Sequence, residues 1–318
     1  MTSFKRVALA AAGATFLLVS IGGLVRATKS GLGCGTDWPH CSGRLLPELA
    51  NRAMVIEYSH RAVAGIVMVL MGALAYLAYR KGLPQRIKRA AVGAFALVLF
   101  QAILGMIVVV LELQAVSVVL HLGTAMALLA LVLYIALTTD DRGVATDART
   151  ARRATRVAVG VFLLLLVGSY MSGAGAGYVF PDWPLMDGRV IPDLAVEGKA
   201  LHFLHRVLAA IVGLVVLHNA IATSRSERKS RASVALAHGA LALFTIEALI
   251  GAANVFTGGN DAFVTLHLAM GAGIWATLVS QAIVTRAAAN ESVAETSRSA
   301  EPALGSARDR LGERAGAS

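Results

Sequence analysis

Residues 57–79 read EYSHRAVAGIVMVLMGALAYLAY. After Arg61 this stretch carries no charge, and its length falls within the roughly 17 to 25 residues that a helix needs to span a bilayer. Seven similar stretches occur elsewhere, so eight spans are expected. They lie near residues 7–25, 57–79, 90–111, 116–137, 157–173, 202–222, 233–255 and 263–285. The sequence therefore predicts an all-α polytopic membrane protein.

The composition agrees with this interpretation. Hydrophobic residues make up 57% of the 318 residues and charged residues 15%, well below the roughly 25% charged residues of typical soluble domains. The first stretch, 7–25, follows Lys5 and Arg6 and so resembles a signal peptide. Its apolar run exceeds the roughly 7 to 15 residues of a signal-peptide core, and we interpret it as a span.

Basic residues gather on one side of the expected spans. The net charge is +10, but most of the 29 Lys and Arg fall in alternate loops, on one side of the expected spans. They do not form a continuous basic face, which argues against a nucleic-acid partner. These loops are residues 5–6, 80–89, 142–156, 225–231 and the tail after 286. Because Lys and Arg are enriched in cytoplasmic loops, we expect a protein of the bacterial cell membrane with both termini in the cytoplasm. Loops 26–56 and 174–201 are then outside.

The second half of the sequence repeats the first at an offset of 145 or 146 residues. Matching pairs include Asp37-Trp38-Pro39 with Asp182-Trp183-Pro184, His60-Arg61 with His205-Arg206, and His121-Leu122 with His267-Leu268. Each copy has an even number of spans, so both enter the membrane in the same direction and their sites lie at similar depth. We expect two tandem, pseudo-symmetric four-helix bundles. Their bounds are 1–137 and 157–286, with a cytoplasmic linker at 138–156 and a flexible tail at 287–318.

Four histidines occupy matching places near the outer ends of the even-numbered spans. They are His60 and His121 in the first half, and His205 and His267 in the second. Ionisable residues inside spans are costly and indicate functional sites. Imidazole is a common ligand of haem iron, which takes one ligand on each side of the ring. A packed, hydrogen-bonded side chain is the alternative for any lone histidine, but the duplication favours two haem sites.

Glu57 marks a chemical difference between the two halves. It stands one turn before His60, so both side chains point to one face of a helix. The matching residue in the second half is His202. The carboxylate has two interpretations. It is simply solvated or paired with an arginine such as Arg61, or it is an acid–base group beside the first haem.

Other charged residues near the spans are less informative. Arg61 and Arg206 follow the first histidine of each pair and either bind haem carboxylates or are simply solvated. Glu112 ends a span, and Glu247 in the seventh span matches Gln101. We assign no role to either glutamate.

The two cysteines, Cys34 and Cys41, lie close together in the first outer loop. A disulfide persists on that oxidising side of the membrane, so we predict that they form one, with two free thiols as the alternative. A zinc site that includes His40 fits less well. It offers three soft ligands where structural zinc usually takes four.

Several of these motifs together resemble the haem A synthase family. They are Gly23-Leu24-Val25-Arg26-Ala27-Thr28, the loop from Gly31 to Cys41 with its Asp-Trp-Pro, Glu57-Tyr58-Ser59-His60-Arg61, and the surroundings of His121, His205 and His267. The resemblance covers residues 5–286, and the loop with paired cysteines is similar to that of the bacterial type.

The resemblance implies an oxidoreductase that converts a ring methyl of haem O to the formyl group of haem A for respiratory terminal oxidases. It implies that His60 and His121 hold the substrate haem, that His205 and His267 hold a haem b cofactor, and that Glu57 is the catalytic carboxylate. Expected partners are the substrate haem O, haem O synthase, the assembling terminal oxidase, an electron donor of unknown identity and the lipid bilayer.

Without the resemblance, the residues support only a di-haem membrane protein. A transmembrane cytochrome that passes electrons from quinol to an outer acceptor is therefore a second hypothesis. Its haems would lie at opposite membrane faces, whereas both histidine pairs are expected at one depth. A duplicated transporter would have broken helices at the midplane, but the glycines cluster at span ends.

Overall fold

The computed structural model describes residues 2–139, 148–227 and 229–286, and its regular elements there are helices. Eight of them are long and apolar enough to cross a membrane. They are α1 (Ser3–Ala27), α2 (Arg52–Arg80), α3 (Gln85–Val110), α4 (Ala115–Thr138), α5 (Ala148–Gly173), α6 (Glu197–Ser224), α7 (Arg231–Phe256) and a final helix, Asp261–Arg286. The prediction of an all-α polytopic membrane protein is confirmed.

Most helices extend beyond the apolar stretches from which they were predicted. Polar residues cap these extended ends. At the start of α2, for example, the Asn51 side chain accepts a hydrogen bond from the Met54 N–H. The largest difference is at α5, which begins at Ala148 although its apolar stretch was expected from 157. Part of the expected linker is thus helical. Residues 140–147 of that linker and the expected tail, 287–318, lie outside the described residues.

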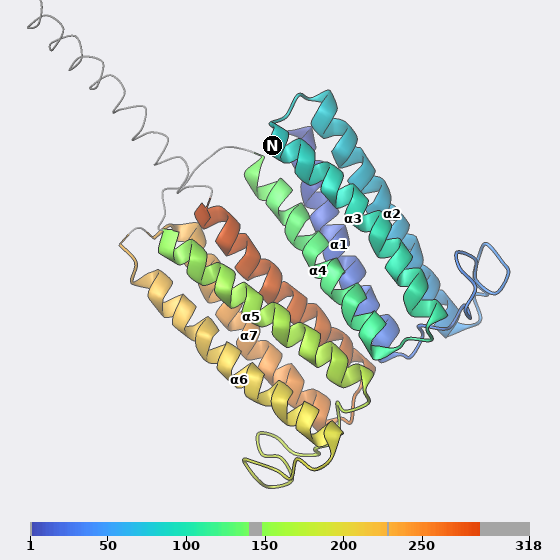
Figure 1. The fold of residues 1–318 in the computed structure, drawn as a ribbon, viewed down its shortest axis with the longest axis vertical. Helices are drawn as coiled ribbons and strands as arrows, with labels where there is room; N and C mark the ends of the chain where they lie inside the picture. Colours follow the sequence, from blue (N-terminus) through green and yellow to red (C-terminus); the bar gives the residue numbers. More distant parts are fainter. Residues whose placement is uncertain (1, 140–147, 228, 287–318) are drawn as a thin grey trace, which may run out of the picture.

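The first four helices form a square bundle (Figure 1). Both α1 and α3 pack against α2 and α4, so α2 and α4 stand diagonally across the bundle. The core between them mixes large side chains such as Met71 and Leu74 with small ones such as Ala91 and Ala94. Small residues let membrane helices approach closely. The diagonal places the histidine-bearing helices on opposite sides of the bundle centre.

The second half joins the first through a shared apolar core. Here α5 packs against α6 and α4, and α6 packs against α7. Val19 of α1 and Met126 of α4 belong to the same buried cluster as Val161 of α5 and Trp275 of the final helix. The loops that follow α1 and α5 lie at one end of the molecule, opposite the N-terminus (Figure 1). Both copies therefore run in the same direction.

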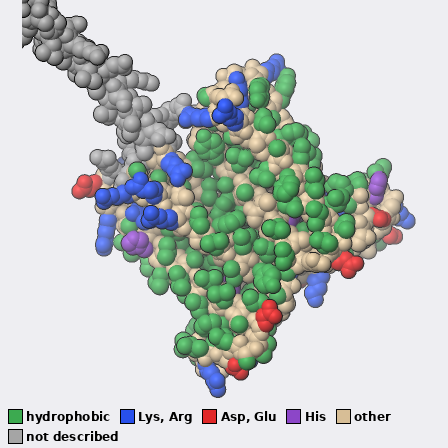
Figure 2. Space-filling view, viewed as in Figure 1, with side chains coloured by type: hydrophobic (Ala, Val, Ile, Leu, Met, Phe, Trp, Pro, Cys, Tyr) green, Lys and Arg blue, Asp and Glu red, His purple; other side chains and the backbone are tan. Residues whose placement is uncertain are grey.

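The surface has the character of a protein that contacts lipid (Figure 2). Hydrophobic side chains cover the body of the visible face, and Lys and Arg gather mainly at the end that holds the N-terminus. Large apolar residues such as Val69 and Leu214 are exposed although they lie mid-helix. Lipid would cover these side chains. The chain is a multi-pass membrane protein.

Candidate haem sites

The four histidines lie at nearly the same depth, each about two helical turns from the N-terminal end of its helix. They are His60 on α2, His121 on α4, His205 on α6 and His267 on Asp261–Arg286. All four are half-buried. The repeat seen in the sequence is thus a repeat in space.

Each bundle brings its two histidines together. The ring centroids of His205 and His267 are 6.4 Å apart, and the ring planes are inclined by 74°. A metal–imidazole bond is about 2 Å long, so two rings that bind one metal from opposite sides have centroids about 6 Å apart. His60 and His121 occupy the matching positions on α2 and α4, which face each other diagonally across the first bundle. The spacing in the second bundle would allow both imidazoles to hold one haem iron.

A glycine on the neighbouring helix makes room for each imidazole. A Cβ atom placed on any of these glycines would come within 3.3 Å of the Cε1 atom of its histidine, or within 2.9 Å in the tightest case, Gly168. The pairs are Gly22 with His60, Gly105 with His121, Gly168 with His205 and Gly251 with His267. Glycine therefore lets each ring pack directly on the neighbouring backbone.

The ring nitrogens also fit a haem. The Nδ1 atoms of His60, His121 and His205 are buried and have no well-formed hydrogen bond among the described residues, although the His60 ring approaches the Leu18 backbone. Around Gly168, Nδ1 of His205 lies nearer the glycine than Nε2 does. Nε2 is thus the nitrogen held farther from the neighbouring helix. Haem iron takes imidazole ligands of this kind from either side.

Glu57 connects α2 to the first outer loop. Its side chain is buried, with 3% of the residue exposed. Oε2 accepts a hydrogen bond from the Cys34 N–H at 2.7 Å, and Oε1 lies 2.5 Å from Nη2 of Arg61. The interpretation of Glu57 as an ion-pair partner of Arg61 is therefore correct. The same contacts hold the carboxylate one turn from His60.

The arginines beside the first histidine of each pair hold the outer loops. Nη1 of Arg61 donates to the carbonyls of Asp37 and His40, at 3.1 and 2.9 Å. Nη1 of Arg206 donates to the carbonyls of Asp182 and Leu185, at 2.9 and 3.0 Å. Simple solvation, one of the two interpretations of these arginines, is therefore wrong.

The position that matches Glu57 is filled differently in the second half. Nε2 of His202 accepts a hydrogen bond from Nε of Arg206 at 3.0 Å. Nη2 of Arg206 is buried without a partner among the described residues. The first half thus offers a paired carboxylate, and the second half offers an arginine nitrogen with unused hydrogen-bonding capacity.

Both outer loops contain the same tight turn, stabilised in different ways. Backbone hydrogen bonds join Cys41 to Arg44 and Met186 to Arg189, and the residues between them have positive φ, as a type I′ turn requires. The first turn is closed by the predicted Cys34–Cys41 disulfide, which is present. In the second, the Asp182 carboxylate accepts hydrogen bonds from the backbone N–H groups of Gly188 and Asp187, which lower the pKa of Asp182 below 3.8.

Comparison with known proteins accords with this arrangement. The family described as cytochrome oxidase assembly protein, COX15-CtaA, matches residues 5–203 and 196–307. The haem A synthase of Shouchella clausii is 31% identical over 262 residues, which cover 80% of this chain and 87% of that protein. The chain belongs to the haem A synthase family. The family's Symbiobacterium thermophilum member is 29% identical over 314 residues, 92% of this chain and 99% of that protein.

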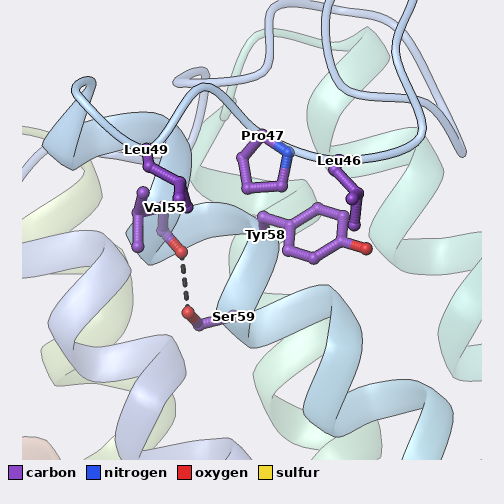
Figure 3. A pocket seen from close by; sticks show the side chains of 6 residues that line it. All are labelled: Leu46, Pro47, Leu49, Val55, Tyr58 and Ser59. Carbon is purple, nitrogen blue, oxygen red and sulfur yellow. Dashed lines mark hydrogen bonds between the residues drawn. The ribbon is translucent and has the colours of Figure 1, made fainter.

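This haem A synthase family member also has an apolar pocket of about 350 Å³ beside its first outer loop (Figure 3). The loop contributes Leu46, Pro47 and Leu49, and α2 contributes Val55, Tyr58 and Ser59. Glu57 and His60 do not line it. The pocket is therefore separate from the histidine pair, although Tyr58 also packs against the buried disulfide.

Sequence reasoning missed two kinds of residue at the haem sites of this family member. The first is the set of glycines against the imidazoles, which the repeat offset could have revealed, since Gly22 and Gly168 match as the histidines do. The second is Glu247, to which no role was assigned because the residue at the matching position is Gln101. Its Oε1 atom lies 3.0 Å from Nδ1 of His267.

Proposed function

We propose that this membrane oxidoreductase converts a ring methyl of haem O to the formyl group of haem A, for use by respiratory terminal oxidases. The main support for the proposal is a chemical difference between the two duplicated halves of the chain. Both halves present a pair of histidines, but only the first half has a carboxylate, Glu57, one turn from the first histidine. A site that transforms a haem needs an acid–base group, and a site that only holds one does not.

In the first half, His60 and His121 hold the substrate haem O by its iron. Conversion of a ring methyl and a water molecule to a formyl group releases protons and electrons. Glu57, at the edge of that site, would accept the protons, and the electrons would pass to an external electron acceptor. Arg61 forms an ion pair with Glu57 and so fixes the position of its carboxylate beside the site. The loop carbonyls that bind Arg61 keep it in place when the charge on Glu57 changes.

In the second half, His205 and His267 hold haem b. When bound, haem b supplies a one-electron redox centre next to the substrate half. Arg206 suits the carboxylates of this haem, because its Nη2 atom is buried without a partner among the described residues. The bundles 1–137 and 157–286 are then the functional units, one for substrate and one for cofactor.

The distribution of charge supports an orientation in the bacterial cell membrane. The basic end of the molecule, with the N-terminus, faces the cytoplasm, and the outer loops with the disulfide face the opposite side. Haem O synthase supplies the substrate, and the assembling terminal oxidase receives the product. Both haem sites then lie near the outer face.

The second hypothesis, a quinol-linked cytochrome with a haem at each membrane face, has less support. All four histidines lie about two turns from the same end of the molecule. Such an arrangement carries electrons sideways between the halves and not across the bilayer.

The test is to produce the chain together with a haem O synthase in a bacterium that makes no haem A, and to identify the haems extracted from its membranes. We expect haem A with the unaltered chain and only haem O with a His60→Ala variant that inserts normally. Haem b in the purified protein without any haem A in the membranes would reject the enzyme and favour the cytochrome.

A further inference from the structure

Glu247 is a half-buried carboxylate inside the second bundle that has no role in the function proposed above. It lies on α7, and 13% of its side chain is exposed. Charged side chains are costly within membrane spans, and those that occur there usually serve a functional site. Its contacts identify which site this is.

The Glu247 carboxylate faces one of the two histidines proposed to hold haem b. Oε1 lies 3.0 Å from Nδ1 of His267, and Oε2 is buried without a hydrogen-bond partner among the described residues. On the other side, a Cβ atom on Gly271 would be 3.5 Å from Oε1 and 2.8 Å from the Leu165 side chain. The carboxylate thus lies between the Gly271 backbone and the His267 imidazole.

The matching residue of the first half makes different contacts. The Gln101 amide is occupied, because Nε2 donates to the His121 carbonyl at 2.7 Å and Oε1 accepts from the Thr124 hydroxyl at 2.5 Å. The residue that matches Thr124 is Met270, which has no hydroxyl to donate. The second half therefore leaves its carboxylate available to the histidine ring.

We propose that Glu247 is a positioning residue that accepts a hydrogen bond from the Nδ1–H group of His267, directs Nε2 toward the haem iron and lowers the reduction potential of that haem. The inference rests on the proposed haem b site. The present contact has the distance but not the angle of a good hydrogen bond, and catalytic hydrogen bonds commonly tighten once the ligand is bound.

The expected effect on the haem follows from the charge of the carboxylate. A carboxylate that accepts the second N–H of a metal-bound histidine fixes its tautomer and makes it a more basic ligand. Both the basic ligand and the nearby negative charge stabilise ferric over ferrous iron. The second-half haem is then oxidised more readily, and its midpoint potential is lower than it would be without the carboxylate.

The test is a potentiometric titration of the purified holoprotein, with electron paramagnetic resonance of its ferric haem b. Glu247→Gln keeps the size of the side chain and removes its charge, and Glu247→Asp keeps the charge but withdraws it from the ring. Glu112→Gln is the matched control, because Glu112 is exposed at the end of α3.

We expect Glu247→Gln to keep haem b, to shift its midpoint potential in the positive direction and to move its resonance g values toward those of neutral bis-imidazole haem. Glu247→Asp should shift the potential less, and the control not at all. If Glu247→Gln loses its haem, a positive shift in Glu247→Asp still supports the proposal.

Two results would overturn the inference. One is an unchanged potential and spectrum in every variant that retains haem b, and the other is loss of haem from both Glu247 variants, which would indicate a packing role. Neither depends on haem A formation. A chain with the expected shift but no haem A would reject the proposed enzyme and leave this inference standing.

Discussion

Glu57 has two tasks that can be separated by experiment. It holds the Cys34 backbone and Arg61, and it lies one turn from His60, where a proton acceptor is needed. A buried carboxylate is tolerated when donors surround it. The sequence presented these tasks as alternatives, because it could not show that one side chain reaches both the loop and the site.

We predict that Glu57→Gln retains haem b and inserts normally but accumulates haem O or a partly oxidised haem. Loss of a general base commonly slows a reaction by about 10²-fold or more, and the haem A yield should fall accordingly. Chromatography of the extracted haems measures this, with Glu48→Gln, an exposed change in the same loop, as control. A normal yield would refute the catalytic role, and loss of haem b would make Glu57 structural.

Asp182 gives the second outer loop a defined dependence on pH. The N–H groups of Gly188 and Asp187 lower the pKa of Asp182 below 3.8. The contribution of its ionised carboxylate to loop stability is therefore fully present at any pH above the pKa that Asp182 has in the unfolded state. That contribution is lost only as pH falls below about 4, through the folded-state pKa.

Hydrogen exchange of residues 182–189, corrected for the intrinsic effect of pH, should therefore stay constant from neutral pH to about 5 and rise below about 4. Asp182→Asn should exchange faster already at neutral pH. The first outer loop, closed by its disulfide, is the internal control. A loop that loosens between about pH 7 and 5 would mean that another group holds the turn.

At the scale of the helices, hydropathy predicted how many spans there are but not where they end. The apolar stretch near 157–173 understated α5, because its first turns are basic and so fall below any hydropathy threshold. The pairing of each imidazole with a glycine was also not predicted, because it depends on which helices are neighbours. Gly22 and His60 meet only because α1 packs on α2.

We predict that Gly168→Ala disturbs the haem b site. The added Cβ would lie 2.9 Å from Cε1 of His205, too close to be accepted without a shift of the ring. Overpacking of this kind costs roughly 1–3 kcal/mol. The haem b content and its absorption spectrum report the change. Gly160→Ala, on the same helix with its nearest contact at 3.8 Å, should leave both unaltered. Equal effects of the two substitutions would contradict the account.

At the scale of the molecule, the duplication explains why the sequence indicated so much of the site. The repeat offset grouped isolated histidines into two matched pairs. In the first bundle, the diagonal placement of α2 and α4 lets the histidines of one pair face each other across the bundle centre. The differences between the halves were harder to interpret. The replacement of Glu57 by His202 was visible as a change of residue type. The importance of Glu247 was not, because it depends on a hydroxyl that the first half has at Thr124 and the second half lacks at the matching residue, Met270.

In the function proposed above, one half of the protein transforms a haem and the other retains one. The most direct test of this division is the amount of haem b, haem O and haem A bound per chain in purified His60→Ala and His205→Ala, each produced with a haem O synthase. We predict that His60→Ala keeps its haem b and contains neither haem O nor haem A, whereas His205→Ala loses haem b. Loss of haem b from His60→Ala, or its full retention in His205→Ala, would contradict this division between the halves.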